Sequence, residues 1–249
     1  MKKFITFLFV AMFLLTFSTG WTQLSIEAGI NGGATIPTGD YSGTMQEFYD
    51  GTKYGLSTGF NVGGYATLTT PIISARVSLN YSSLSNNGSL KDNPSHTIDL
   101  KHNIFTIGIG PQYNISIPAS PIKPYAIAEL LISTIGGEVT FHGLSGSGIN
   151  SGSVYDIATA SRIGLGITGG LSYELSIIGI DLSVKYSILN LSGKEFVSDN
   201  TNLRLSSYTN LNDGKDPLYG TDPNVHIVGN ERNISTVQIN LGVHLKLGI

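Results

Sequence analysis

Two glycine motifs in the sequence have the spacing of known nucleotide-binding or catalytic loops. Residues 164–169 read Gly-Leu-Gly-Ile-Thr-Gly, the pattern that holds a dinucleotide pyrophosphate at the start of a helix. Residues 55–59 read Gly-Leu-Ser-Thr-Gly, the pattern that places a nucleophilic serine on a strand–turn–helix elbow. No helical pattern of apolar residues follows either motif. We therefore interpret 164–169 as small residues inside a strand and 55–59 as a chance match, and we assign no chemistry to either.

Acidic side chains gather in a polar segment near the C-terminal end of the chain. Asp213, Asp216 and Asp222 lie there among several asparagines. Carboxylate and amide oxygens are the ligands that Ca²⁺ prefers, but the spacing does not follow the calcium loop of an EF-hand. We therefore expect a solvated loop and no metal site.

The histidines are too scattered to suggest a catalytic group. Four of them belong to predicted loops or strand ends: His96, His102, His142 and His226. His244 is the only one predicted inside a strand, and Lys246 follows it on the same face. No serine–acid pair is placed beside His244. We predict that the protein is not an enzyme and that it uses no cofactor.

The elements that must position these residues are β-strands. In the last segment, apolar residues from Val237 to Ile249 alternate with polar or small ones from Thr236 to Gly248. A period of two places one set on each face of a strand. The same alternation predicts eight strands, at residues 24–36, 56–68, 73–81, 105–117, 125–133, 162–175, 180–188 and 236–249.

The connections between these strands alternate between short and long. The short ones are residues 69–72, 118–122 and 176–179; the long ones are residues 37–54, 85–100, 142–160 and 191–232. Membrane barrels of the up-and-down type have short periplasmic turns and long extracellular loops. We therefore predict an all-β fold, an eight-stranded antiparallel up-and-down transmembrane β-barrel with both termini on the periplasmic side.

The chemistry of the two faces argues against a water-soluble barrel. The apolar face carries no charge, whereas a face wetted by water would be charged. The opposite face is dominated by Gly, Ser, Thr and Asn, which suits the narrow interior of a barrel that side chains just fill. A soluble barrel such as a lipocalin has an apolar interior instead.

The first residues have the features of an export signal. Lys2 and Lys3 precede an apolar or hydroxyl run from Phe4 to Phe17, and Ser18-Thr19-Gly20 follows. This run is shorter than the roughly 20 residues that a membrane-spanning helix needs, so a cleaved signal peptide is expected. We predict a signal peptide at residues 1–22, cleaved after about Gly20 or Thr22, and a barrel domain at residues 23–249. The chain has no cysteine, so neither disulfides nor N-terminal lipidation is available.

The charges predicted on the inner face balance each other. The charged residues that alternate with the apolar face of each strand are Glu27, Glu129, Glu174 and Asp181 on the acidic side and Arg76, Arg162, Lys185 and Lys246 on the basic side, with His244 beside them. Buried charges must be paired, or they cost several kcal/mol. Glu27 and Lys246 lie at similar depth on the first and last strands, so we predict a salt bridge where the barrel closes. These charges either form a polar plug or line a narrow pore.

The strand count, signal peptide and loop alternation resemble the small outer-membrane β-barrel family. This is the superfamily of the OmpA-like transmembrane domain and of OmpX-like barrels, in the form common in Bacteroidota. Lys123-Pro124-Tyr125 after a short turn and the closing strand from Gln238 to Ile249 also carry the resemblance. The chain departs from many relatives by ending in Leu247-Gly248-Ile249 rather than in an aromatic residue. No peptidoglycan-binding domain is expected, so tethering to the cell wall is not predicted.

The resemblance implies a structural component and surface anchor of the outer membrane of a Gram-negative bacterium. Its extracellular loops, above all residues 191–232, are expected to mediate adhesion or partner binding, with Tyr208 and Tyr219 as candidate contacts. The expected partners are outer-membrane lipid and lipopolysaccharide, an extracellular ligand, and periplasmic chaperones and the barrel-assembly machinery during biogenesis. A net charge of −3 and the lack of a basic run argue against nucleic acid. The alternative is a porin-like channel for ions or small solutes through the charged lumen.

Overall fold

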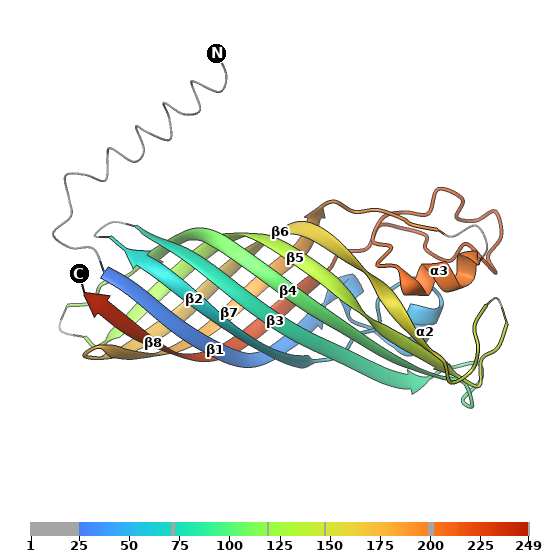
Figure 1. Cartoon of the computed structure of the whole chain (residues 1–249), viewed down its shortest axis with the longest axis horizontal. Helices are drawn as coiled ribbons and strands as arrows, with labels where there is room; N and C mark the ends of the chain where they lie inside the picture. The colour runs from blue at the N-terminus through green and yellow to red at the C-terminus, as the bar shows by residue number, and fades with distance from the viewer. Residues whose placement is uncertain (1–24, 71–72, 119, 147, 199–201, 249) are drawn as a thin grey trace, which may run out of the picture.

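The computed structural model describes residues 25–70, 73–118, 120–146, 148–198 and 202–248. The predicted signal peptide lies outside these residues. Within the described part, eight antiparallel strands form one closed barrel, because β1 pairs with β8 as well as with β2 (Figure 1). The strands are β1 (Ser25–Thr38), β2 (Gly59–Thr69), β3 (Ser74–Ser89), β4 (Thr97–Asn114), β5 (Ile122–His142), β6 (Val154–Leu175), β7 (Ile178–Ser192) and β8 (Ser235–Gly248). The predicted up-and-down architecture is therefore confirmed.

Short and long connections alternate around the barrel, as predicted. Residues 70–73, 115–121 and 176–177 connect strands at one end, which we call the short-turn end. Residues 39–58, 90–96, 143–153 and 193–234 connect them at the other, which we call the long-loop end. The loops at residues 39–58 and 193–234 also contain short helices: η2 (Gly39–Tyr41), α2 (Met45–Tyr49) and α3 (Leu203–Thr209).

Strands extend into two of the predicted loops, which corrects the bounds predicted at residues 85–100 and 142–160. β3 pairs with β4 as far as Ser89 and Thr97, and β5 pairs with β6 as far as Thr140 and Val154. Most outward side chains here are polar, as at Asn87 and Asp99, so the alternation with an apolar face does not mark these segments as strands. The same polarity suits a sheet that continues into water beyond an apolar belt.

The middle of the barrel exposes a continuous apolar belt. Each strand contributes exposed large residues to it, among them Ile30, Val62, Leu79, Ile107, Leu130, Ile167, Leu182 and Leu241. Exposed aromatic rings lie toward both margins, with Phe105 on the long-loop side and Tyr113 on the short-turn side. Across the described strands, no charged side chain interrupts this belt, because charges at its level, such as Glu129, are buried inside.

Glycines on the inner face leave room for large inward side chains. A Cβ at Gly166 would lie 2.9 Å from the Lys185 side chain, and one at Gly179 would overlap the His244 ring. Gly166 belongs to the glycine motif at residues 164–169, which lies within β6. The motif at residues 55–59 runs into the first residue of β2 and is not followed by a helix. Both motifs thus lack the turn into a helix that their chemistry needs.

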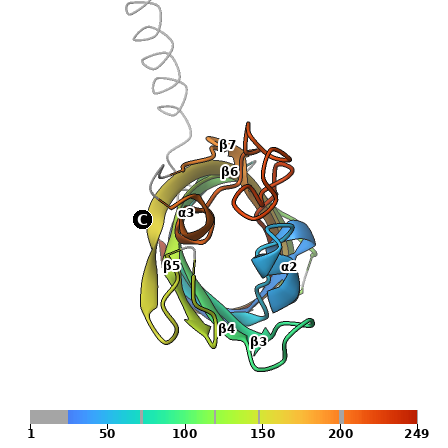
Figure 2. The same ribbon diagram turned by 90° about the vertical axis from the view of Figure 1, so that its right-hand side faces the viewer.

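An apolar core, not predicted from the sequence, fills the long-loop end. Figure 2 looks onto this end and shows α2 and α3 at the mouth of the ring of strands. We call this core the plug. It combines strand residues (Leu84, Ile98, Leu100, Ile104, Leu131, Ile135, Val139, Phe141, Ile157 and Leu189) with loop residues (Tyr41, Met45, Phe48, Tyr54, Leu56, Tyr208, Leu211, Ile227, Val228 and Ile234), all buried. Among the described residues, no helix is long and apolar enough to cross a membrane.

Candidate functional site

The structure places all nine predicted lumen residues on the inner face. Seven of them are buried: Glu27, Arg76, Glu129, Arg162, Asp181, Lys185 and His244. Glu174 and Lys246 are partly exposed near the short-turn mouth. They do not form one network, however. They divide into a group at the short-turn end, a pair at mid-depth and an arginine beneath the loops.

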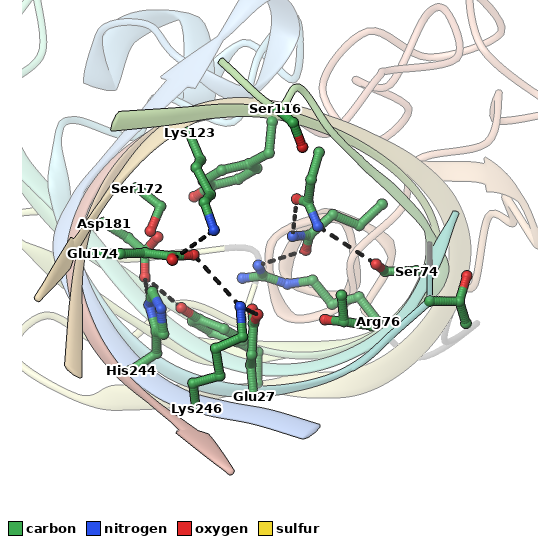
Figure 3. Close-up of a pocket in the computed structure, with 16 residues that line it drawn as sticks. Glu27, Ser74, Arg76, Ser116, Lys123, Ser172, Glu174, Asp181, His244 and Lys246 are labelled. Atoms are coloured by element: carbon green, nitrogen blue, oxygen red, sulfur yellow. Dashed lines mark hydrogen bonds and ion pairs between the residues drawn. The ribbon is translucent and has the colours of Figure 1, made fainter. Parts of the chain in front are cut away.

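The group at the short-turn end surrounds a cavity of about 190 Å³, which we call the vestibule (Figure 3). Lys246 Nζ lies 3.4 Å from Glu27 Oε1, the salt bridge predicted across the closing strands. The same nitrogen lies 3.7 Å from Glu174 Oε1, and Lys123 pairs with Oε2 of Glu174. Lys123 is not among the predicted lumen residues. It lies an even number of positions from Glu129 on β5, however, and therefore faces the same side of the sheet.

Asp181 accepts two hydrogen bonds deeper in the vestibule. Its Oδ2 lies 2.6 Å from Nδ1 of His244, and the Tyr65 hydroxyl donates to the same oxygen. An acid–histidine pair is part of many hydrolytic sites, but a nucleophile must lie within hydrogen-bond reach of the histidine. Among the described residues, His244 has no serine or threonine hydroxyl as a hydrogen-bond partner. The arrangement thus positions charge and gives no support to hydrolytic catalysis.

A second ion pair lies at mid-depth. Lys185 Nζ is 2.7 Å from Glu129 Oε2, and Ser78 donates a hydrogen bond to the other carboxylate oxygen. On the long-loop side of this pair, the Gln238 amide donates to Asn80 and Ser82, each at 3.0 Å. The cavities between these groups measure only about 30 and 10 Å³. Each therefore has room for about one water.

Arg162 pairs with a loop rather than with another lumen charge, which corrects the predicted balance of four against four. Its Nε and Nη2 donate to Asp213 at 2.9 and 2.8 Å, and its Nη1 lies 3.1 Å from Glu195. Asn190 also donates to Asp213, at 2.9 Å. Burial opposes ionisation of Asp213, but these hydrogen bonds outweigh it and hold the pKa of the carboxyl below its usual value.

The acidic loop residues are not all solvated, and this corrects a second prediction. Asp213 and Asp216 are fully buried, and Oδ2 of Asp216 lies 2.7 Å from Nδ1 of His226. Asp222 remains exposed. Among the described residues, no group of three or more acidic or histidine side chains could hold a metal ion. The buried carboxylates instead fold the loop onto the barrel.

The two candidate contact tyrosines have opposite environments. Tyr208 is 2% exposed, packs in the plug and donates a hydrogen bond to the carbonyl of Tyr49. It is therefore a core residue and is not exposed to a partner, which corrects its prediction as a contact. Tyr219 is 52% exposed and remains available. Its neighbour Leu218 is 53% exposed.

The plug also contains a histidine that the sequence placed at a strand end. His102 lies within β4 and is fully buried, with Nδ1 3.1 Å from the Tyr41 hydroxyl. The ring of Tyr54 packs edge-on against it. Burial raises the pKa of Tyr54, so its hydroxyl stays neutral and donates to the carbonyl of Leu211. These rings connect both long loops to the barrel wall and close the lumen at this end.

Comparison with known proteins finds distant structural likenesses only. No protein-family model matches the sequence, and a search of curated proteins finds no relative. The fold is similar to that of Neisserial surface protein A, at 17% identity and a TM-score of 0.45, covering 89% of this chain and 96% of that one. It is also similar to a major outer membrane protein from Thermus thermophilus, at 13% identity and a TM-score of 0.48, with coverage of 89% and 99%.

The outer membrane protein OprG from Pseudomonas aeruginosa is a third similar structure, at 11% identity and a TM-score of 0.43, covering 91% of this chain and 96% of that one. At such identities and scores, the likeness transfers no function. The class of this protein is instead defined by its own strand register: it is a closed, eight-stranded, antiparallel up-and-down β-barrel.

Proposed function

We propose that this protein is an outer-membrane β-barrel that anchors an ordered loop surface outside the cell. The observation that carries the proposal is the uninterrupted apolar belt around a barrel with a largely polar interior. Along β4, the eight steps from Phe105 to Tyr113 span about 26 Å at roughly 3.3 Å per residue. A strand tilt of about 40° reduces this to about 20 Å, near the height of the apolar band in such barrels.

The proposed orientation follows from the connections. In bacterial outer-membrane barrels the short turns face the periplasm and the long loops face outward. The polar outer faces of β3 to β6 beyond the belt then lie at the level of the lipopolysaccharide head groups. Chaperones and the barrel-assembly machinery would act on this chain as on other barrels.

The partner-binding part of the proposal centres on the exposed turn at Leu218 and Tyr219. The buried carboxylate of Asp216 accepts a hydrogen bond from the backbone N–H of Leu218 at 2.8 Å, and its carbonyl accepts one from Tyr219. His226 holds that carboxylate in turn. The turn is therefore ordered before a partner arrives, and two neighbouring apolar side chains on a polar loop favour a protein contact.

Two measurements test the proposal separately. Membrane insertion is tested by gel mobility in detergent: a folded barrel should migrate differently before and after boiling, and unchanged mobility would refute it. Partner binding is tested with cells of a non-adherent strain displaying the protein, exposed to matrix proteins and to other bacteria. Tyr219→Ala should reduce attachment, whereas Val197→Ala, at another exposed apolar position of the same loop, should not. Attachment unchanged by Tyr219→Ala would refute this contact.

The channel alternative is not favoured by any feature of the lumen. The plug fills the long-loop end, and each of the two cavities beneath it has room for only about one water. We expect inserted protein to show no discrete conductance steps in a planar bilayer. Reproducible steps from the unmodified protein would require the plug to open and would restore this alternative.

A further inference from the structure

We propose that the vestibule binds a carboxylate group through Arg76. Its side chain is 8% exposed and lines the vestibule, with its guanidinium directed toward the centre of the lumen (Figure 3). The inference concerns the short-turn mouth and is independent of whether the loops bind a partner.

Arg76 is the cation in the described part of the lumen that forms no direct salt bridge, although Asp181 and Glu129 lie near enough to interact with its charge. The other described lumen cations each make a salt bridge: Lys123 and Lys246 to Glu174, Lys185 to Glu129, and Arg162 to Asp213. Arg76 makes none with the described residues, and the nearby Asp181 is engaged by Tyr65 and His244. A buried charge without a direct ion pair is costly, so an anion that enters the vestibule gains the ion pair that Arg76 lacks.

The geometry around Arg76 favours a carboxylate among anions. Its guanidinium carbon lies 3.6 Å from the centroid of the Tyr65 ring, so the ring covers one face of the guanidinium and holds its plane. Gln112 accepts one N–H at 3.2 Å, and Nε has no partner among the described residues. The guanidinium carries five N–H donors in one plane. Nε is buried, and Arg76 also hydrogen-bonds Tyr125, so the remaining Nη N–H groups are the donors that can meet a ligand. A stacked guanidinium that presents these donors in one plane suits the planar geometry of a carboxylate.

The size and charge of the vestibule limit what can carry that carboxylate. A volume of about 190 Å³ equals roughly six waters at about 30 Å³ each, so it admits a small acid or the last residue of a peptide. Lys123 and Lys246 at the rim are already neutralised by Glu174 and Glu27. They provide no second strong anion site, which favours a single carboxylate over a multiply charged phosphate.

Calorimetric titration of the folded protein in a non-ionic detergent tests the inference. The probes are acetate, tri-alanine with a free C-terminus and tri-alanine amide. We expect the wild type to bind a free carboxylate and to lose about 10- to 100-fold in affinity in Arg76→Gln, the range for a hydrogen bond to a charged group. Lys101→Gln, on the outer face beyond the belt, is the matched control and should bind as the wild type does.

The probes also distinguish the two sources of a carboxylate. Tighter binding of tri-alanine than of acetate would identify a peptide C-terminus, and equal binding would identify a small free acid. Equal binding of the amide, or binding unchanged in Arg76→Gln, would overturn the inference, as would no binding at all. If Arg76→Gln fails to fold, Arg76→Lys keeps the charge but loses the planar fork and should still bind more weakly; unchanged affinity in this variant would overturn the bidentate geometry.

Discussion

Asp213→Asn should release the loop at residues 193–234 from the barrel without unfolding the barrel. In the wild type, Asp213 is fully buried and accepts hydrogen bonds from Arg162, Asn190 and the backbone N–H of Glu195. Removing the charge leaves Arg162 buried with only the exposed Glu195 carboxylate. Breaking a buried ion pair costs about 3–5 kcal/mol, and the remaining Glu195 contact favours the lower end, about 3 kcal/mol.

This cost predicts a measurable change in local opening. About 3 kcal/mol corresponds to roughly a 100-fold larger equilibrium constant for opening, since about 1.4 kcal/mol is tenfold. Hydrogen exchange followed by mass spectrometry should therefore show about 100-fold faster exchange at Gly214, whose N–H donates to the carbonyl of Glu195. The strand amides of β4 should keep their protection. Asp222→Asn, at an exposed position of the same loop, is the control. Unchanged exchange at Gly214 in Asp213→Asn would refute the anchoring role.

Three further results are expected. The pKa of Asp213 is lower in the folded protein than in the unfolded chain. Its contribution to loop stability is therefore complete above about pH 4 and is lost as the pH falls through the folded pKa. Exchange of the loop amides, corrected for intrinsic rates, should increase only below about pH 4. Lys185→Met leaves Glu129 buried without its partner and should lower the urea midpoint by the equivalent of about 3–5 kcal/mol, whereas Lys185→Met with Glu129→Gln should lose much less; equal losses would contradict a coupled pair. Tyr54→Ala removes a buried ring from the plug and should cost about 3–5 kcal/mol of folding stability. Samples heated to increasing temperatures before electrophoresis should therefore change from the folded to the unfolded mobility at a lower temperature than the wild type does. An unchanged temperature would show that the plug does not stabilise the barrel.

The apolar belt could be predicted from the sequence because lipid imposes one rule on every strand. Outward residues such as Val184 must be apolar wherever they face lipid, while inward ones must be small or paired, and this produces a period of two along the chain. The same rule places Glu27 and Lys246 at one depth on adjacent strands, which is why their contact could be predicted. The same alternation places Lys123 on the inner face, so its position in the lumen also follows from the sequence.

The plug could not be predicted by that rule, because the pattern reverses where the strands leave the belt. Along β5 the exposed apolar residues Leu130 and Ile132 have even numbers, whereas the buried ones farther along, Ile135 and Val139, have odd numbers. The outer face becomes polar in water and the inner face becomes apolar against the loops. If the apolar residues of a strand are assumed to keep to one face along its whole length, the strand is predicted to end where they change face. The buried loop contacts of Asp213 depend on tertiary packing and have no local sequence signal.

The plug also determines how partner binding must be tested. The loop at residues 193–234 supplies buried plug residues such as Leu211 and Val228 as well as the exposed turn at Tyr219. Trimming this loop would remove both, so a loss of adhesion would not separate a missing contact from an opened barrel. Substituting Tyr219 alone leaves the plug intact. Because the turn is ordered in advance, a partner would lose little affinity to ordering the loop. If Asp213→Asn frees the loop, the same partner should bind more weakly although Tyr219 is still present. Comparing Asp213→Asn with Tyr219→Ala then separates the effect of ordering the loop from the effect of the tyrosine contact itself.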